Sequence, residues 1–182
     1  MFWMLILNYY LRRMSKKPPI NLRSFKARVK HTKTAMRRYL SKIDRNRPRG
    51  LDTTIATLEK EVWKEIDCLS CANCCKTMTP TYTPTDLKRI STHFKLTVDQ
   101  FKEKYLKQER GGPRDWMNKK QPCQFLNLKD NKCSIYAIRP ADCAGFPHLT
   151  KKFKEYVHIH KQNVEYCPAT YRLVEKMMER VG

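Results

Sequence analysis

The chain has 182 residues, of which 41% are hydrophobic and 30% are charged, so it is long enough for one core domain with an extension. This composition excludes collagen-like, low-complexity and wholly disordered chains. Because 38 Lys and Arg residues face only 17 Asp and Glu residues, the formal net charge is +21. An excess of this size indicates an acidic partner: nucleic acid, the ribosome or an anionic membrane.

Residues 1–13 are predicted to be either a mis-called start, with Met14 as the true first residue, or a membrane-surface segment. The segment is apolar from its first residue and is followed by Arg12 and Arg13, which is the reverse of the order in a signal peptide. Its apolar stretch is also too short to cross a bilayer. We therefore expect a reducing compartment, with the protein cytoplasmic or peripheral to the membrane.

Residues 14–50 are predicted to form a basic amphipathic helical arm. Apolar residues recur at helical steps between residues 20 and 44, and the opposite face is rich in Lys and Arg. Residues 1–50 hold 15 Lys and Arg residues but one acid, Asp44. We expect this arm to dock on RNA, the ribosome or an anionic membrane surface, without base-specific readout. An ordinary solvated helix face is the alternative.

Residues 51–182 are predicted to form a cysteine-cluster metal-binding domain. A helix at about 53–66 would make a helical hairpin with the arm, and capping boxes at Thr83 and Thr97 predict two further helices. A hairpin is expected over residues 123–136, a short strand over 153–160 and a closing helix over 168–181. The predicted class is α+β and mostly helical: a small metal-stabilised domain with an N-terminal basic helical hairpin.

Eight cysteines are the second unusual feature of the composition. They are Cys68, Cys71, Cys74, Cys75, Cys123, Cys133, Cys143 and Cys167. The first four follow the pattern C-x2-C-x2-C-C, in which a tight turn brings thiolates to one ion and a single loop can serve several corners of an iron–sulfur cluster. Because Cys74 and Cys75 are adjacent, we expect them to point in different directions, so that one serves the local site and the other reaches a second site or a later cysteine.

The four later cysteines are each expected at a turn or at the end of an element. Cys167, for example, precedes Pro168 at a predicted helix start, where the helix N-terminus stabilises a thiolate. Eight sulfurs could form two four-cysteine zinc sites, one iron–sulfur cluster with spare thiols, or a two-metal cluster with shared sulfurs. The cofactor is therefore Zn²⁺ or iron, the latter including a 4Fe-4S cluster. Buried free cysteines that merely pack are the alternative.

Other residues add less to the site. His148 is either an additional nitrogen ligand or a loop histidine with a structural hydrogen bond. Arg139 and Asp142 are expected to fix the turn that presents Cys143. His158 and His160 are expected at the surface. The sequence shows no Ser/His/Asp arrangement, paired carboxylates or phosphate-binding glycine loop, so no catalytic residue is assigned.

The segment IDCLSCANCC, followed by PCQFLNLKDNKCSIYAIRPADCAGFPH and a late Cys-Pro, resembles the YkgJ-type cysteine-cluster proteins, described as zinc- or iron-chelating. The resemblance covers roughly residues 51–178, and the cysteine region of flagellin lysine N-methylases is similar. It implies a metal-binding domain with all eight cysteines as candidate ligands. The basic arm departs from the family pattern, and no methyltransferase domain is present.

Two functions are consistent with these features. The first is a binding protein whose zinc or iron–sulfur site is mainly structural and whose basic arm docks on a polyanion. The second is an iron–sulfur redox or protein-modifying enzyme related to the flagellin lysine N-methylases. Because no acid–base set is evident in the sequence, the first is favoured.

Overall fold

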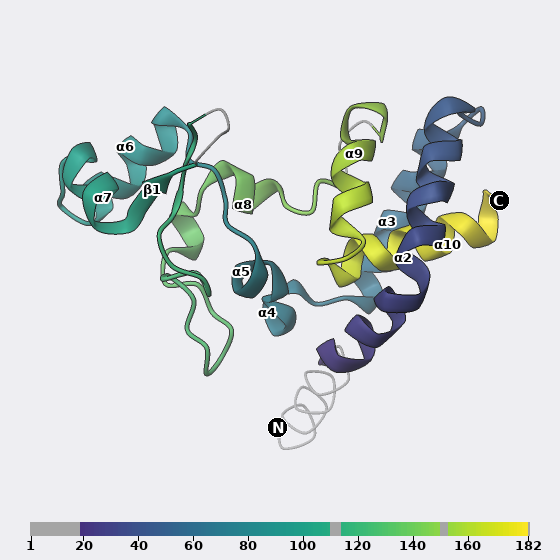
Figure 1. The fold of residues 1–182 in the computed structure, drawn as a ribbon, viewed down its shortest axis with the longest axis horizontal. Helices are drawn as coiled ribbons and strands as arrows, with labels where there is room; N and C mark the ends of the chain where they lie inside the picture. The colour runs from purple at the N-terminus through teal and green to yellow at the C-terminus, as the bar shows by residue number, and fades with distance from the viewer. Residues whose placement is uncertain (1–18, 110–113, 150–152, 182) are drawn as a thin grey trace, which may run out of the picture.

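The computed structural model describes residues 19–109, 114–149 and 153–181, which are mostly helical with one small antiparallel sheet. Figure 1 shows a helical bundle on one side and, on the other, a cysteine lobe that contains the sheet. This arrangement confirms the predicted mostly helical α+β class. Residues 1–13, predicted to be a mis-called start or a membrane-surface segment, lie outside the described residues.

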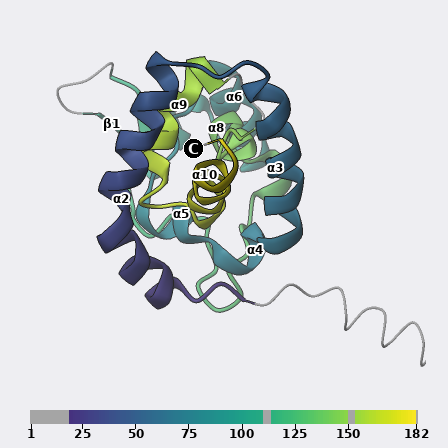
Figure 2. The same ribbon diagram turned by 90° about the vertical axis from the view of Figure 1, so that its right-hand side faces the viewer.

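The bundle consists of α2 (Leu22–Arg45), α3 (Leu51–Glu65), α9 (Phe153–Asn163) and α10 (Pro168–Arg180). The apolar face predicted for the arm is buried in the largest hydrophobic cluster of the protein. Its buried residues are Phe25, Val29, Met36, Leu40 and Ile43. Figure 2 shows α10 between α2 and α3, so the two helices of the predicted hairpin pack mainly against α10 and α9.

The strand predicted over residues 153–160 is wrong, because helix α9 covers this segment. Phe153, Val157 and His160 are buried at steps of four and three residues, which is the periodicity of a helix. The exposure of His158 agrees with the expected surface position, whereas His160 is fully buried and was expected at the surface.

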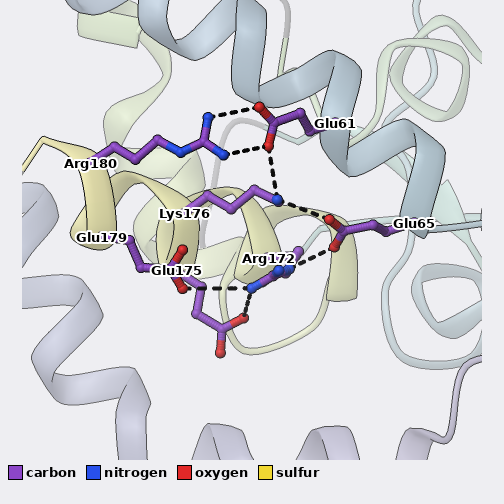
Figure 3. A network of polar contacts seen from close by, with 7 residues as sticks. All are labelled: Glu61, Glu65, Arg172, Glu175, Lys176, Glu179 and Arg180. Carbon is purple, nitrogen blue, oxygen red and sulfur yellow. Dashed lines mark hydrogen bonds and ion pairs between the residues drawn. The ribbon is translucent and has the colours of Figure 1, made fainter.

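A network of ion pairs joins α3 to α10 (Figure 3). The ammonium group of Lys176 lies 2.9 Å from a carboxylate oxygen of Glu61 and 2.9 Å from one of Glu65. Arg180 pairs with Glu61, and Arg172 pairs with Glu65 at 2.7 Å. Hydrogen bonds from Arg180 and Lys176 lower the pKa of Glu61 to about 2. These charges therefore fix how α3 and α10 lie against each other.

The cysteine lobe is built from short elements. In chain order they are α4 (Cys68–Cys71), α5 (Asn73–Thr77), α6 (Pro84–His93), α7 (Val98–Tyr105), β1 (Leu106–Gln108), β2 (Trp116–Asn118), η1 (Tyr136–Ile138) and α8 (Ala141–Gly145). Both predicted capping boxes are confirmed, because the Thr83 and Thr97 side chains accept from the amides of Asp86 and Gln100. The β1–β2 sheet was not predicted, since its strands have only three residues each.

The hairpin predicted over residues 123–136 is reduced to one antiparallel bridge, between Leu126 and Cys133. The turn is nevertheless near the predicted position, since the amide of Asn127 donates to the carbonyl of Lys132 and Asn131 has a positive φ of 60°. A second, smaller hydrophobic cluster around Phe101 and Ile90 supports the lobe. Within the described ranges, no helix has both the length and the apolar character that a membrane span requires.

Candidate metal centre

The first four cysteines lie on two short helices joined by a sharp turn. Asp67 caps α4 by accepting from the amide of Leu69, and Ala72 joins α4 to α5 with a φ of 46°. The Cys74 and Cys75 sulfurs are 3.9 Å apart. They were expected to point in different directions, but consecutive positions on α5 leave the two sulfurs in contact.

Three distant segments bring later cysteines to the same place. The amide of Cys123 donates to the carbonyl of Cys75 at 2.8 Å, and the bridge from Leu126 holds Cys133. Cys143 lies on α8, whose first amide, that of Ala141, donates to the carboxylate of Asp86 on α6. Together with Cys68 and Cys74, these residues give six thiols that line one pocket with a volume of about 200 Å³.

The walls of this pocket are largely apolar. Met78, Tyr82, Phe125 and Phe146 contribute to them, and Leu69 and Tyr136 also line the pocket while remaining exposed to solvent. The side-chain amide of Asn118 donates to the Cys123 sulfur at 3.2 Å. Thiols in such surroundings are poorly solvated, and they become stable thiolates only with a cation beside them.

The pKa values agree with this description. Burial raises the pKa of the Cys123, Cys133 and Cys143 thiols, and interaction with Cys75 raises it further. The hydrogen bond with Cys74, followed by burial, raises the pKa of Cys75. Without a metal, these groups are therefore neutral at physiological pH, and metal binding would release their protons.

Cys71 and Cys167 do not line the pocket. Both are buried, with 7% and 4% of their surface exposed; Cys71 is the last residue of α4, and Cys167 precedes α10. Cys167 is the N-cap residue of α10 and is followed by Pro168, as predicted. The side-chain amide of Asn73 donates to the carbonyl of Tyr166 at 2.6 Å, which joins the two segments.

His148 lies beside the pocket but is not one of its lining residues. Its Nε2 is 3.6 Å from a carboxylate oxygen of Asp142, and its ring lies against Tyr156. Asp142 also accepts from the amide of Thr81, and the guanidinium of Arg139 donates to the carbonyl of Tyr136 while lying over that ring. Asp142 thus holds the segment of Thr81, and Arg139 holds the turn that ends at Tyr136.

A metal would have to draw the sulfurs together, since no three Cys, His, Asp or Glu side chains of the described segments already converge on one point. The donor set nevertheless fits zinc or iron, for which thiolates are favoured ligands. Rotation of a Cys side chain to another staggered position moves its sulfur by about 3 Å. The displacement of a sulfur by side-chain rotation is therefore large enough to assemble a metal site.

Two supporting residues were missed in the sequence because their roles depend on tertiary contacts. Asn118 hydrogen-bonds to the Cys123 sulfur and accepts from the Tyr82 hydroxyl at 2.7 Å. Asp86 was recognised only as a capping residue, yet its carboxylate also accepts from Ala141 at the start of α8. Neither contact has a signal in local sequence.

The clustered thiols on short, loosely connected elements define the class of small cysteine-cluster metal-binding domains. The chain belongs to the CxxCxxCC family, described as a "putative zinc- or iron-chelating domain", whose pattern matches residues 67–168. It is also 32% identical over 81 residues to the uncharacterized protein MJ0661 of Methanocaldococcus jannaschii. That match covers 44% of this chain and 43% of the relative, so the chain spans less than half the length of the relative it matches. No solved structure is significantly similar.

Proposed function

We propose that this chain is a cytoplasmic binding protein in which cysteine-bound metal, most simply zinc, stabilises the cysteine lobe while the outer face of α2 docks on RNA. The observation that carries the metal role is the pocket that gathers six thiols from four separate segments. Between residues 119 and 149 the described chain has only η1 and α8 as regular elements. Cross-linking by metal would supply the stability that so little secondary structure cannot.

The structural role predicts what metal removal does. A strong zinc chelator should lower the midpoint of thermal unfolding by about 10 °C or more, because a site worth several kcal/mol is removed. Limited proteolysis should then cut between residues 119 and 149 before it cuts α2 or α3. If the chelated protein kept its melting temperature and its protease resistance, the metal would not be structural.

The docking surface is the basic face of α2. Its exposed cations lie opposite the buried stripe, and none has an acidic partner among the described residues. They are Arg23, Lys26, Arg28, Lys30, Arg38, Lys42 and Arg45. By contrast, Lys33 and Arg37, which are closer to the bundle, pair with Glu165 at 2.8 and 2.9 Å. The unpaired cations are thus available for phosphates.

RNA suits this face better than a membrane does. An interfacial helix binds lipid by inserting its apolar face, but the apolar face of α2 is buried in the bundle. The exposed large apolar side chains of the described chain, Leu69, Leu128, Tyr136, Tyr166 and Met178, all lie on other elements. A purely cationic face is typical of contact with a phosphate backbone.

Fluorescence anisotropy with a short RNA of mixed sequence tests this surface. Replacement of Arg23, Lys30, Arg38 and Arg45 by Gln should weaken binding and reduce the slope of log affinity against log salt by about one for each phosphate that the variant no longer neutralises. The matched control replaces four exposed lysines of the cysteine lobe, Lys88, Lys107, Lys120 and Lys129, by Gln. Equal weakening in both variants, or binding to anionic vesicles but not to RNA, would contradict the assignment.

One observation favours the alternative, an iron–sulfur redox or protein-modifying enzyme. The thiol pocket is open to solvent and is larger than a single closed zinc site requires. A cluster with an open position could therefore meet a substrate there. A brown protein that contains iron and sulfide would support this function over the structural one.

A further inference from the structure

We propose that the eight cysteines form two adjacent four-sulfur metal centres that are divided at the Cys74–Cys75 peptide bond. The first centre, here called the pocket centre, contains Cys75, Cys123, Cys133 and Cys143. The second, here called the junction centre, contains Cys68, Cys71, Cys74 and Cys167. This assignment rests on the proposed metal-binding function and names the ligands of each site.

The pocket centre is indicated by three later segments whose cysteines line the same pocket as Cys75. Cys123 is tied to Cys75 by a backbone hydrogen bond of 2.8 Å, and all four thiols line the same pocket. The bridge between Leu126 and Cys133 and the hydrogen bond from the Ala141 amide to Asp86 hold the other two cysteine-bearing segments at this pocket.

The junction centre is indicated by the two cysteines that the pocket leaves out. Cys71 and Cys167 are both buried, and a hydrogen bond from Asn73, two residues after Cys71, to the carbonyl of Tyr166, next to Cys167, holds their two segments together. Cys167 is the N-cap residue of α10, so the first backbone amides of that helix lie beside its thiol. A helix N-terminus beside two buried thiols favours the thiolate form that a metal needs.

Cys68 and Cys74 are assigned to the junction centre because of their positions in the sequence relative to Cys71. Cys68, Cys71 and Cys74 follow one another at steps of three residues on α4 and α5, so one short segment can present all three to one ion. Charge balance also favours two centres over one. Four thiolates with one divalent cation have a net charge of −2, whereas eight thiolates on one cation would have a net charge of −6 in apolar surroundings. Since Cys167 belongs to the core of the bundle, this centre would fasten the lobe to the bundle.

The 3.9 Å distance between the Cys74 and Cys75 sulfurs admits one competing assignment. Two ligands of one tetrahedral zinc ion lie about 3.8 Å apart for a Zn–S bond of about 2.3 Å, so both cysteines could bind the same ion. The two assignments predict different zinc contents for the protein in which both Cys74 and Cys75 are replaced by Ser.

The test is zinc content per chain, measured by mass spectrometry of the elements on full-length protein produced with zinc. The wild-type protein should hold two equivalents. Cys75→Ser with Cys123→Ser should leave one, as should Cys71→Ser with Cys74→Ser, because each pair empties one centre. Cys74→Ser with Cys75→Ser should leave none, because this pair breaks both centres.

Ser134→Ala, next to Cys133, is the control and should keep two equivalents. One equivalent in the Cys74→Ser, Cys75→Ser variant would overturn the division, as would a single equivalent in the wild type. No bound metal in the wild type would overturn the proposed function as well. If the serine variants fail to fold, release of zinc from the wild-type protein to a colorimetric chelator replaces them: two equivalents support the proposal, and one overturns it.

Discussion

His160 is a buried histidine whose protonation opposes folding. It is 1% exposed, its Nδ1 has no hydrogen-bond partner among the described residues, and its ring stacks on Phe153. Burial, together with the charges of His148 and His158, lowers its pKa to about 4. The folded protein thus keeps this side chain neutral, whereas the unfolded chain binds a proton below about pH 6.5.

Stability should therefore decrease as the pH falls from about 6.5 to 4. The lowered pKa corresponds to a decrease of about 3 kcal/mol in the free energy of unfolding over this range. His160→Leu should remove most of that pH dependence, while the exposed control His158→Leu should keep it. Urea unfolding between pH 7.5 and 4 measures the effect, and an unchanged pH slope in His160→Leu would contradict this interpretation.

At the scale of single residues, the sequence allowed eight candidate cysteine ligands to be named, but it did not show which of them lie together. The spacing of Cys68, Cys71 and Cys74 is visible in the sequence, whereas the hydrogen bond that links the segment of Cys71 to that of Cys167 is seen only in the structure. The burial of His160, which was expected at the surface, likewise depends on tertiary packing. Burial depends on neighbours that are distant along the chain, and local pattern does not encode them.

Lys176 is the central cation between two helices. It contacts Glu61 and Glu65 on α3, and these contacts raise its pKa, while only 7% of its side chain is exposed. The pKa of Glu61 is about 2 in the folded protein, compared with an ordinary value of 4.5. Its ion pairs therefore stabilise the fold above about pH 4.5, and this stabilisation disappears as the pH falls towards 2. The network should therefore stabilise the α3–α10 contact at neutral pH.

Lys176→Met keeps the apolar stem and removes the charge. We expect the midpoint of thermal unfolding to fall by a few degrees at pH 7, because two carboxylates lose a partner in a half-buried position. The difference from the wild type should shrink as the pH falls below about 4.5. The control Lys64→Met, an exposed lysine of α3, should match the wild type. Calorimetry at pH 7 and pH 3 measures both, and a constant difference would argue against the network.

Elements were predictable where one face of a helix is fully buried. The five buried apolar residues of α2 repeat at helical steps, so its sequence pattern was sufficient. In α9, Tyr156, His158 and His160 alternate with other residues and suggested a strand, whereas packing against α2 and α10 selects the helix. The three-residue strands β1 and β2 are too short to give a period-two signal.

The whole molecule separates its charge from its cysteines. The basic face belongs to α2 of the bundle, while the thiol pocket is lined by residues of the cysteine lobe. Figure 1 shows α2 on one side of the molecule and most of the lobe on the other. The net charge of the chain is +21. Four of its glutamates pair with cations of the α3–α10 network (Figure 3), so these four do not neutralise the cations of α2. A junction centre that joins lobe to bundle would couple metal binding to the position of the docking face.

The central claim is that the eight cysteines bind metal as a structural device. Metal and inorganic sulfide analysis, with an optical spectrum, on protein purified without oxygen tests it most directly. The account predicts two zinc ions per chain, no sulfide and no visible absorption. Iron with an equal amount of sulfide and a broad absorption near about 400 nm, as expected for an iron–sulfur cluster, would contradict it and make redox chemistry the working function.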